Sequence, residues 1–225
     1  MKLTLGLILH GVLFSCLASS ADDSLVRTGD ELLDPLSRRI VQDARKYYTE
    51  ELFKDIEVFE GMNAFVLFSG SFSIPLVTLN EPSYLKQNDL ESYRFIYSRS
   101  FHPPIVIRIE KEKERGYRVI SKIGEAQGTT DHRRHELGIK LRKERKLKEY
   151  EVEQFLEMLR DCSFWDAPFE DLDEEIGLDG ATWGFEGVKN GNHTLLQRWS
   201  PDSGPFFYLG VYFLYLGEIE ADPVY

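Results

Sequence analysis

The chain has 225 residues, with 27 Lys and Arg against 38 Asp and Glu, so its formal net charge is −11. This acidic balance argues against nucleic acid and anionic lipid surfaces as partners. The length suffices for one domain with a sizeable core, and we expect a single domain over residues 22–225. Only two cysteines are present, so no internal disulfide framework is expected.

Residues 1–21 have the layout of a secretory signal, in which Lys2 precedes an apolar run and then small residues. The run is shorter than the roughly 20 residues that cross a bilayer. Two kinds of processing are open: ordinary cleavage near Ala21, which we favour, or a lipoprotein signal over 1–15 with lipidation at Cys16. The protein is therefore expected to be periplasmic, envelope-anchored or secreted, with membrane attachment only through a lipid on Cys16.

The first half of the mature chain predicts one helix and one short strand. Asp34 can cap a helix and Pro35 can begin it, and apolar residues recur at helical spacing to give a helix near 34–52. The segment 63–77, "NAFVLFSGSFSIPLV", is apolar and rich in Ser and Gly, which predicts a short strand followed by a loop.

The centre of the chain predicts an antiparallel meander. Alternating apolar residues in "YRFIYSR" (93–99), "IVIRIEKE" (105–112) and "YRVISKI" (117–123) indicate three strands. The basic stretch 133–148 is interpreted as a solvated strand or helix face, with a stripe that meets an acidic partner protein as the alternative. A helix near 149–162 follows, and its apolar stripe places Cys162 in the core.

A hairpin and a last helix complete the prediction. Asn190-Gly191 is a strong type I′ turn signal, and a two-residue loop sets Trp183 opposite Arg198. The guanidinium could then lie over the indole. The apolar segment near 205–217 predicts a buried helix, or a partner-binding surface if exposed. The expected fold is α+β: one antiparallel sheet of about six strands with two or three packed helices.

Two apparent metal motifs fail on their spacing. In "DHRRHELG" (131–138) a zincin motif requires histidine at position 139, which is Ile139. The acidic segment 171–179 lacks the glycine and the final acid of an EF-hand, although an irregular calcium site stays open. We therefore predict no metal and no cofactor.

The polar and aromatic candidates for a binding site lie in three short segments: His102, Asp179, Trp183, Glu186, Arg198 and Trp199. Asp179 and Glu186 could serve as the acid and base of a hydrolase, with His102 as a further candidate. The favoured interpretation is architectural: Asp179 closes a turn, Glu186 pairs with a cation and Arg198 holds the hairpin.

Four segments together resemble a family of bacterial exported proteins: "RSFHPPIVIRIE" (99–110), "FWDAP" (164–168), "GLDGATWGFEGV" (177–188) and "RWSP" (198–201). The resemblance covers about the second half of the chain. It departs at 124–138, where the family has a glycine-rich turn with a tyrosine. The family has no assigned activity, so the resemblance implies export and a bacterial source but no reaction.

The leading functional hypothesis is a non-catalytic binding protein of the bacterial envelope whose partner is another protein. Aromatic residues make up 13% of the chain, charge is segregated along it, and no catalytic constellation passes its spacing test. The alternatives are an envelope hydrolase that uses Asp179, Glu186 or His102, and a calcium-stabilised module. A hydrolase requires two of those residues in one pocket, whereas a binding protein does not.

Overall fold

The computed structural model describes residues 35–54, 56, 63–85, 87, 89–113, 115–125, 138–170, 179–222 and 224. These residues form four α-helices, one short 3-10 helix and a single antiparallel sheet of six strands, so the predicted α+β class is confirmed. In chain order the elements are α2 (Pro35–Ala44), η2 (Glu50–Phe53), α3 (Ala64–Thr78), β1 (Ser92–Arg99), β2 (Ile105–Glu112), β3 (Gly116–Gly124), β4 (Ile139–Lys146), α4 (Glu149–Asp161), β5 (Ala181–Lys189), β6 (Asn192–Trp199) and α5 (Gly204–Leu216).

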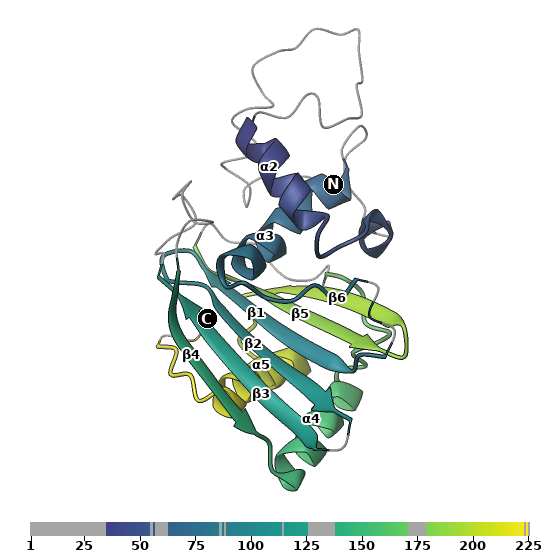
Figure 1. The fold of residues 1–225 in the computed structure, drawn as a ribbon, viewed down its shortest axis with the longest axis vertical. Helices are drawn as coiled ribbons and strands as arrows, with labels where there is room; N and C mark the ends of the chain where they lie inside the picture. Colours follow the sequence, from purple (N-terminus) through teal and green to yellow (C-terminus); the bar gives the residue numbers. More distant parts are fainter. Residues whose placement is uncertain are drawn as a thin grey trace, which may run out of the picture.

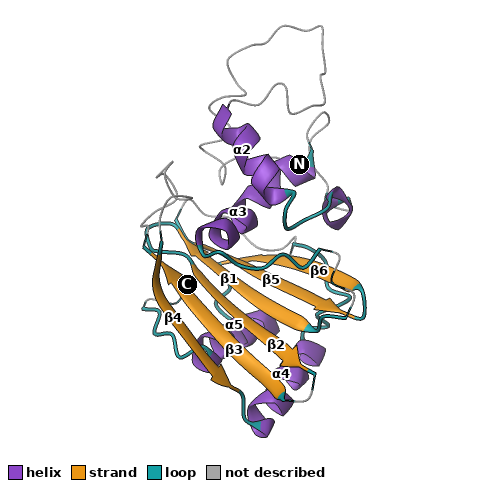
Figure 2. Cartoon of the chain, in the orientation of Figure 1, coloured by secondary structure: helices purple, strands orange, loops and turns teal. Residues whose placement is uncertain are grey.

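Helices cover both faces of the sheet (Figure 1). α4 and α5 pack on one face, which we call the α4/α5 face, and α3 packs on the other with α2 on top of it, so we call that side the α2/α3 face. The strand order is β4-β3-β2-β1-β5-β6, so β4 and β6 are the two edges (Figure 2). Because both faces are covered, the central strands β1 and β5 are buried along almost their whole length.

Side-chain alternation in the strands sorts residues between the two cores. Tyr93, Phe95 and Tyr97 of β1 point to the α4/α5 face, where they join the larger aromatic cluster. Ile96 points to the other face and contacts the α2/α3 core. Arg94, between Tyr93 and Phe95, also lies on the α2/α3 face and is fully buried. The alternation of apolar and polar residues therefore predicts β1 correctly, but it does not predict that the face of β1 with Arg94 is also buried.

The predicted hairpin register is confirmed. Lys189 pairs with Asn192, and Trp183 pairs with Arg198, as a two-residue loop requires. Asn190 and Gly191 have φ angles of 52° and 80°, the left-handed conformation that a type I′ turn needs at both positions. The same register places Trp199 on the α2/α3 face of β6.

The predicted strand at 63–77 is wrong, because this segment is the helix α3. Asn63 caps it, its side chain accepting a hydrogen bond from the amide of Val66 at 3.3 Å. The segment is apolar on all sides, so no helical periodicity was visible in its sequence. The sixth strand is instead β4, which lies in the basic stretch 133–148. For this stretch the sequence allows either a strand or a helix.

The helix ends differ from expectation in one place. The first predicted helix, 34–52, is two elements: α2 ends at Ala44 and η2 begins at Glu50. α4 and α5 lie within a residue of their predicted bounds. Cys162 follows α4 and is buried in the α4/α5 core, as its place on the apolar stripe predicts. Cys16 and the predicted signal lie outside the described residues.

Candidate functional site

The aromatic and cationic candidates of the hairpin are all buried. Trp183 is fully enclosed between the sheet and α5, and Trp199 is buried on the α2/α3 side. The Arg198 guanidinium lies 4.1 Å from the ring centre of Phe206, a residue of α5. It also donates to the carbonyl oxygen of Phe169 at 3.0 Å. These contacts agree with the architectural interpretation of the hairpin.

Of the three residues of the hydrolase hypothesis, Glu186 lies far from the other two. His102 is half-buried in the turn after β1, and Asp179 is exposed just before β5. The amide of Ser100 donates to the carbonyl of Gly180 at 3.0 Å, so these two turns lie at the same end of the sheet. Glu186 lies five residues along β5 from Ala181, about 17 Å away at 3.4 Å per residue.

Glu186 belongs instead to a buried ion-pair network on the α2/α3 face. Its Oε2 accepts from Arg94 Nη1 at 2.9 Å, and its Oε1 lies 2.8 Å from His193 Nε2. Arg94 also lies over the ring of Tyr84 at 4.0 Å and donates to the carbonyl of Pro82 at 2.6 Å. The prediction that Glu186 pairs with a cation is confirmed, but neither Arg94 nor His193 was identified from the sequence.

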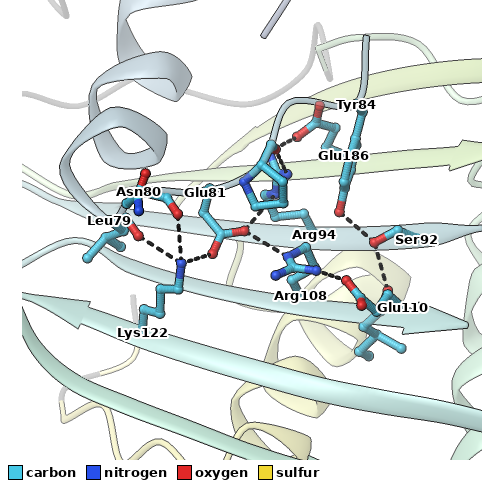
Figure 3. A network of polar contacts seen from close by, with 12 residues as sticks. Leu79, Asn80, Glu81, Tyr84, Ser92, Arg94, Arg108, Glu110, Lys122 and Glu186 are labelled. Atoms are coloured by element: carbon cyan, nitrogen blue, oxygen red, sulfur yellow. Dashed lines mark hydrogen bonds and ion pairs between the residues drawn. The ribbon is translucent and has the colours of Figure 1, made fainter. Parts of the chain in front are cut away.

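Glu81 is the hub of this network (Figure 3). Its carboxylate contacts Lys122 Nζ at 2.7 Å, Arg108 Nε at 2.9 Å and Arg94 Nε at 3.4 Å. Lys122 also donates to the carbonyls of Leu79 and Asn80, just past the C-terminal end of α3. Burial alone would raise the pKa of Glu81, but the three cations outweigh it and hold the pKa below its usual value. The network therefore ties α3 to β1, β2 and β3.

Ion pairs continue from this hub across the sheet towards β4. Arg108 pairs with Glu110, whose Oε1 accepts from Arg118 Nε at 2.7 Å. Arg118 donates to Glu144 at 2.8 Å, and Glu144 pairs with Arg142. The side-chain exposure rises from 0% at Arg94 to 54% at Arg142. The charged side chains at the buried end are fixed by their ion-pair partners, whereas those at the β4 end face solvent.

A second cluster of charges ties together three strands at one end of the sheet. The Glu91 carboxylate accepts from Tyr117 at 2.6 Å, from Lys189 at 3.0 Å and from Lys111 at 3.1 Å. Burial would raise the pKa of Glu91, but these donors lower it to about 2. The carboxylate is therefore ionised at neutral pH and links β2, β3 and β5.

The His193 side chain reaches one pocket of about 250 Å³, between the β5–β6 turn and the segments around η2 and 84–87. Its lining mixes apolar and hydrogen-bonding groups: Thr49, Glu51, Leu52, Tyr84, Leu85, Gln87, Val188, Gly191 and His193. Burial raises the pKa of Tyr84 to about 12, so its phenol is neutral. The pocket can accept a small polar molecule by hydrogen bonds, but it contains neither His102 nor Asp179.

The residues considered for metal binding lie in two segments of the chain. Asp131, His132, His135 and the acidic segment 171–178 lie outside the described residues. Among the residues whose positions are described, no group of three or more His, Cys, Asp or Glu side chains is arranged to hold a metal ion.

Three exposed large apolar side chains lie on α5. Tyr208, Val211 and Tyr215 are 59%, 36% and 58% exposed, and their spacing places them on one side of the helix. We call these three residues the α5 stripe. The opposite side of α5, with Leu209 and Phe213, is buried against the sheet. The helix is thus buried on one side and exposed on the other.

Cations of β4 adjoin the C-terminal end of α5. Lys143 Nζ donates to the carbonyl of Glu218 at 2.7 Å, and Arg145 Nε lies 3.4 Å from the carboxylate of the same residue. Arg145 also forms a two-pronged pair with Glu151 of α4 at 2.9 and 3.0 Å. The α5 stripe and the basic strand β4 therefore form neighbouring parts of one surface.

The chain matches no protein-family model, and no curated protein is significantly similar to it. The helices in the described part of the chain include none that is long and apolar enough to cross a membrane.

Proposed function

We propose that the protein is an exported bacterial envelope protein that binds another protein without catalysing a reaction. The observation that carries this proposal is the α5 stripe. A helix with three large apolar side chains at least 36% exposed keeps apolar area in water that a partner could bury. Tyrosine is favoured in such places because one ring offers both apolar area and a hydroxyl group.

The cations beside the stripe indicate what kind of partner fits. Lys143 and Arg145 adjoin α5, whereas the chain as a whole carries a charge of −11. A local basic surface on an acidic protein favours an acidic partner and disfavours other copies of the same acidic chain. The burial of Trp183, Arg198 and Trp199 supports this proposal, because these side chains of the hairpin are enclosed by the fold and a partner cannot reach them without disturbing it.

The test is site-specific photocrosslinking in the organism that encodes the protein. A benzophenone amino acid is placed at Tyr208 or Tyr215, and at Phe101 as a control that is 64% exposed in the β1–β2 turn. We expect one protein adduct from both α5 positions and none from Phe101. Equal adducts from all three positions, or none from α5, would refute the proposed surface.

The location is tested by intact mass of the protein recovered from the envelope. A chain that begins near Ala21 supports cleavage of an ordinary signal, and a diacylglycerol on Cys16 supports lipid anchoring. Recovery from the cytoplasm of a chain that still begins at Met1 would contradict export.

A further inference from the structure

The two edge strands of the sheet, β6 and β4, differ in whether another segment of the chain forms hydrogen bonds to their outer side. The outer edge of β6 is covered by the segment after α4, since the amide of Gln197 donates to the carbonyl of Phe169 at 2.6 Å and Arg198 donates to the same oxygen. In the described parts of the chain, β4 pairs with β3 alone. None of the described strands pairs with the outer row of backbone N–H and C=O groups of β4, the kind of edge to which another strand can add.

The charge of β4 indicates which kind of segment could pair with this edge. Its cations, Lys140, Arg142, Lys143, Arg145 and Lys146, oppose only Glu144, which gives a local charge of +4 from 5 − 1. Pairing with β4 of a second copy would place cations opposite cations, which is destabilising across strands. A segment with acidic side chains would instead meet opposite charges.

We propose that an extended acidic segment of the partner adds to β4 as a seventh strand of the sheet. This inference rests on the proposed function, because it names how the partner of the α5 surface is held. Main-chain hydrogen bonds to β4 would supply affinity, and acids opposite Arg142 and Lys146 on one face and Lys143 on the other would supply selectivity. The eight residues of β4 span about 27 Å, enough for a partner segment of similar length.

The first experiment selects peptides of 12 residues that bind the full chain from a displayed library at physiological salt. We expect acidic, β-prone sequences; a selection that returns basic or uncharged sequences overturns the proposal. The strongest binder is then synthesised with a fluorophore, and its Kd is measured by anisotropy.

Backbone methylation distinguishes strand addition from simple charge attraction. Two analogues of the peptide carry N-methyl groups on the odd or on the even residues of its central segment. In a β-strand only alternate N–H groups point towards the neighbouring strand, so we expect one analogue to lose at least about tenfold in affinity and the other to retain it. Equal affinities of the two analogues, whether kept or lost, overturn strand addition.

Charge reversal locates the peptide on the protein. We expect Lys140→Glu with Lys146→Glu to weaken peptide binding about tenfold. The double variant Arg38→Glu with Arg39→Glu, on exposed positions of α2, makes the same change in net charge and should leave binding unchanged. Equal losses in both variants overturn the β4 site. Absence of α5 crosslinks in cells would refute the proposed function separately, because the peptide assay does not depend on it.

Discussion

Replacement of Glu81 by Gln should be strongly destabilising, because the carboxylate is the shared partner of three cations. Its side chain is 1% exposed, and its contacts with Lys122, Arg108 and Arg94 measure 2.7, 2.9 and 3.4 Å. Removal of one member of a buried ion-pair network costs about 3–5 kcal/mol, since the remaining charges stay buried without compensation. That is a large part of the 5–15 kcal/mol that usually separates folded and unfolded states.

Glu144→Gln is the matched control. Glu144 belongs to the same line of ion pairs and also contacts two arginines, but its side chain is 32% exposed. Exposed pairs contribute up to about 1 kcal/mol. Unfolding in urea, followed by tryptophan fluorescence, gives both free energies. A loss for Glu81→Gln no greater than that for Glu144→Gln would refute the argument that the Glu81 hub fixes α3 on the sheet.

The pH dependence gives an independent check on the same carboxylate. The pKa of Glu81 is lower in the folded protein than the value of about 4.3 expected in the unfolded chain. The ionised carboxylate therefore stabilises the fold fully above the unfolded pKa, and this stabilisation is lost as the pH falls through the folded pKa. The difference in free energy of unfolding between wild type and Glu81→Gln should be constant from pH 6 to 8 and should shrink below about pH 4. A difference that does not change with pH would contradict this linkage.

Three further predictions test other parts of the structure. Glu91→Gln should cost about 1–2 kcal/mol at neutral pH, and the difference should vanish between pH 4.5 and about 2, where the folded-state carboxyl titrates; urea unfolding at several pH values measures it. Gly210→Ala should cost about 1–3 kcal/mol, because the added methyl group overlaps the Trp183 indole, and a lower urea midpoint with an unchanged slope would show it. Burial raises the pKa of Cys162 to about 11, so in a Cys16→Ser background the thiol should resist iodoacetamide at pH 8 until urea unfolds the chain; rapid labelling of the folded protein would contradict its burial.

The sequence was sufficient wherever local chemistry dictates the backbone. Asn190 and Gly191 form a turn type that few other dipeptides favour. This turn determines the register of both strands, including the pairing of Trp183 with Arg198. Alternation in β1, β2 and β3 was similarly clear. These features depend on neighbours along the chain, so the sequence alone contains the information that sets them.

The sequence was insufficient wherever burial depends on a second layer. α3 is apolar on every side because it lies against both the sheet and α2, and a helix of that kind has no periodicity to detect. The same layer buries Arg94, which occupies a position that alternation assigns to a polar face. Its partners Glu81 and Glu186 lie 13 residues before it and 92 residues after it in the chain, so no local pattern could have joined them.

The line of ion pairs across the α2/α3 face commits Glu186, one of the polar candidates of the sequence, to the fold. At its inner end each charge is already held by a fixed partner: Glu186 by Arg94 and His193, and Glu81 by three cations. Buried charges with fixed partners hold α3 on the sheet, and removal of one of them costs free energy of folding. Towards β4 the same line reaches solvent, where weakly held charges can exchange partners at little cost. The gradient in burial therefore separates the charges that maintain the fold from those that face solvent at the edge strand β4.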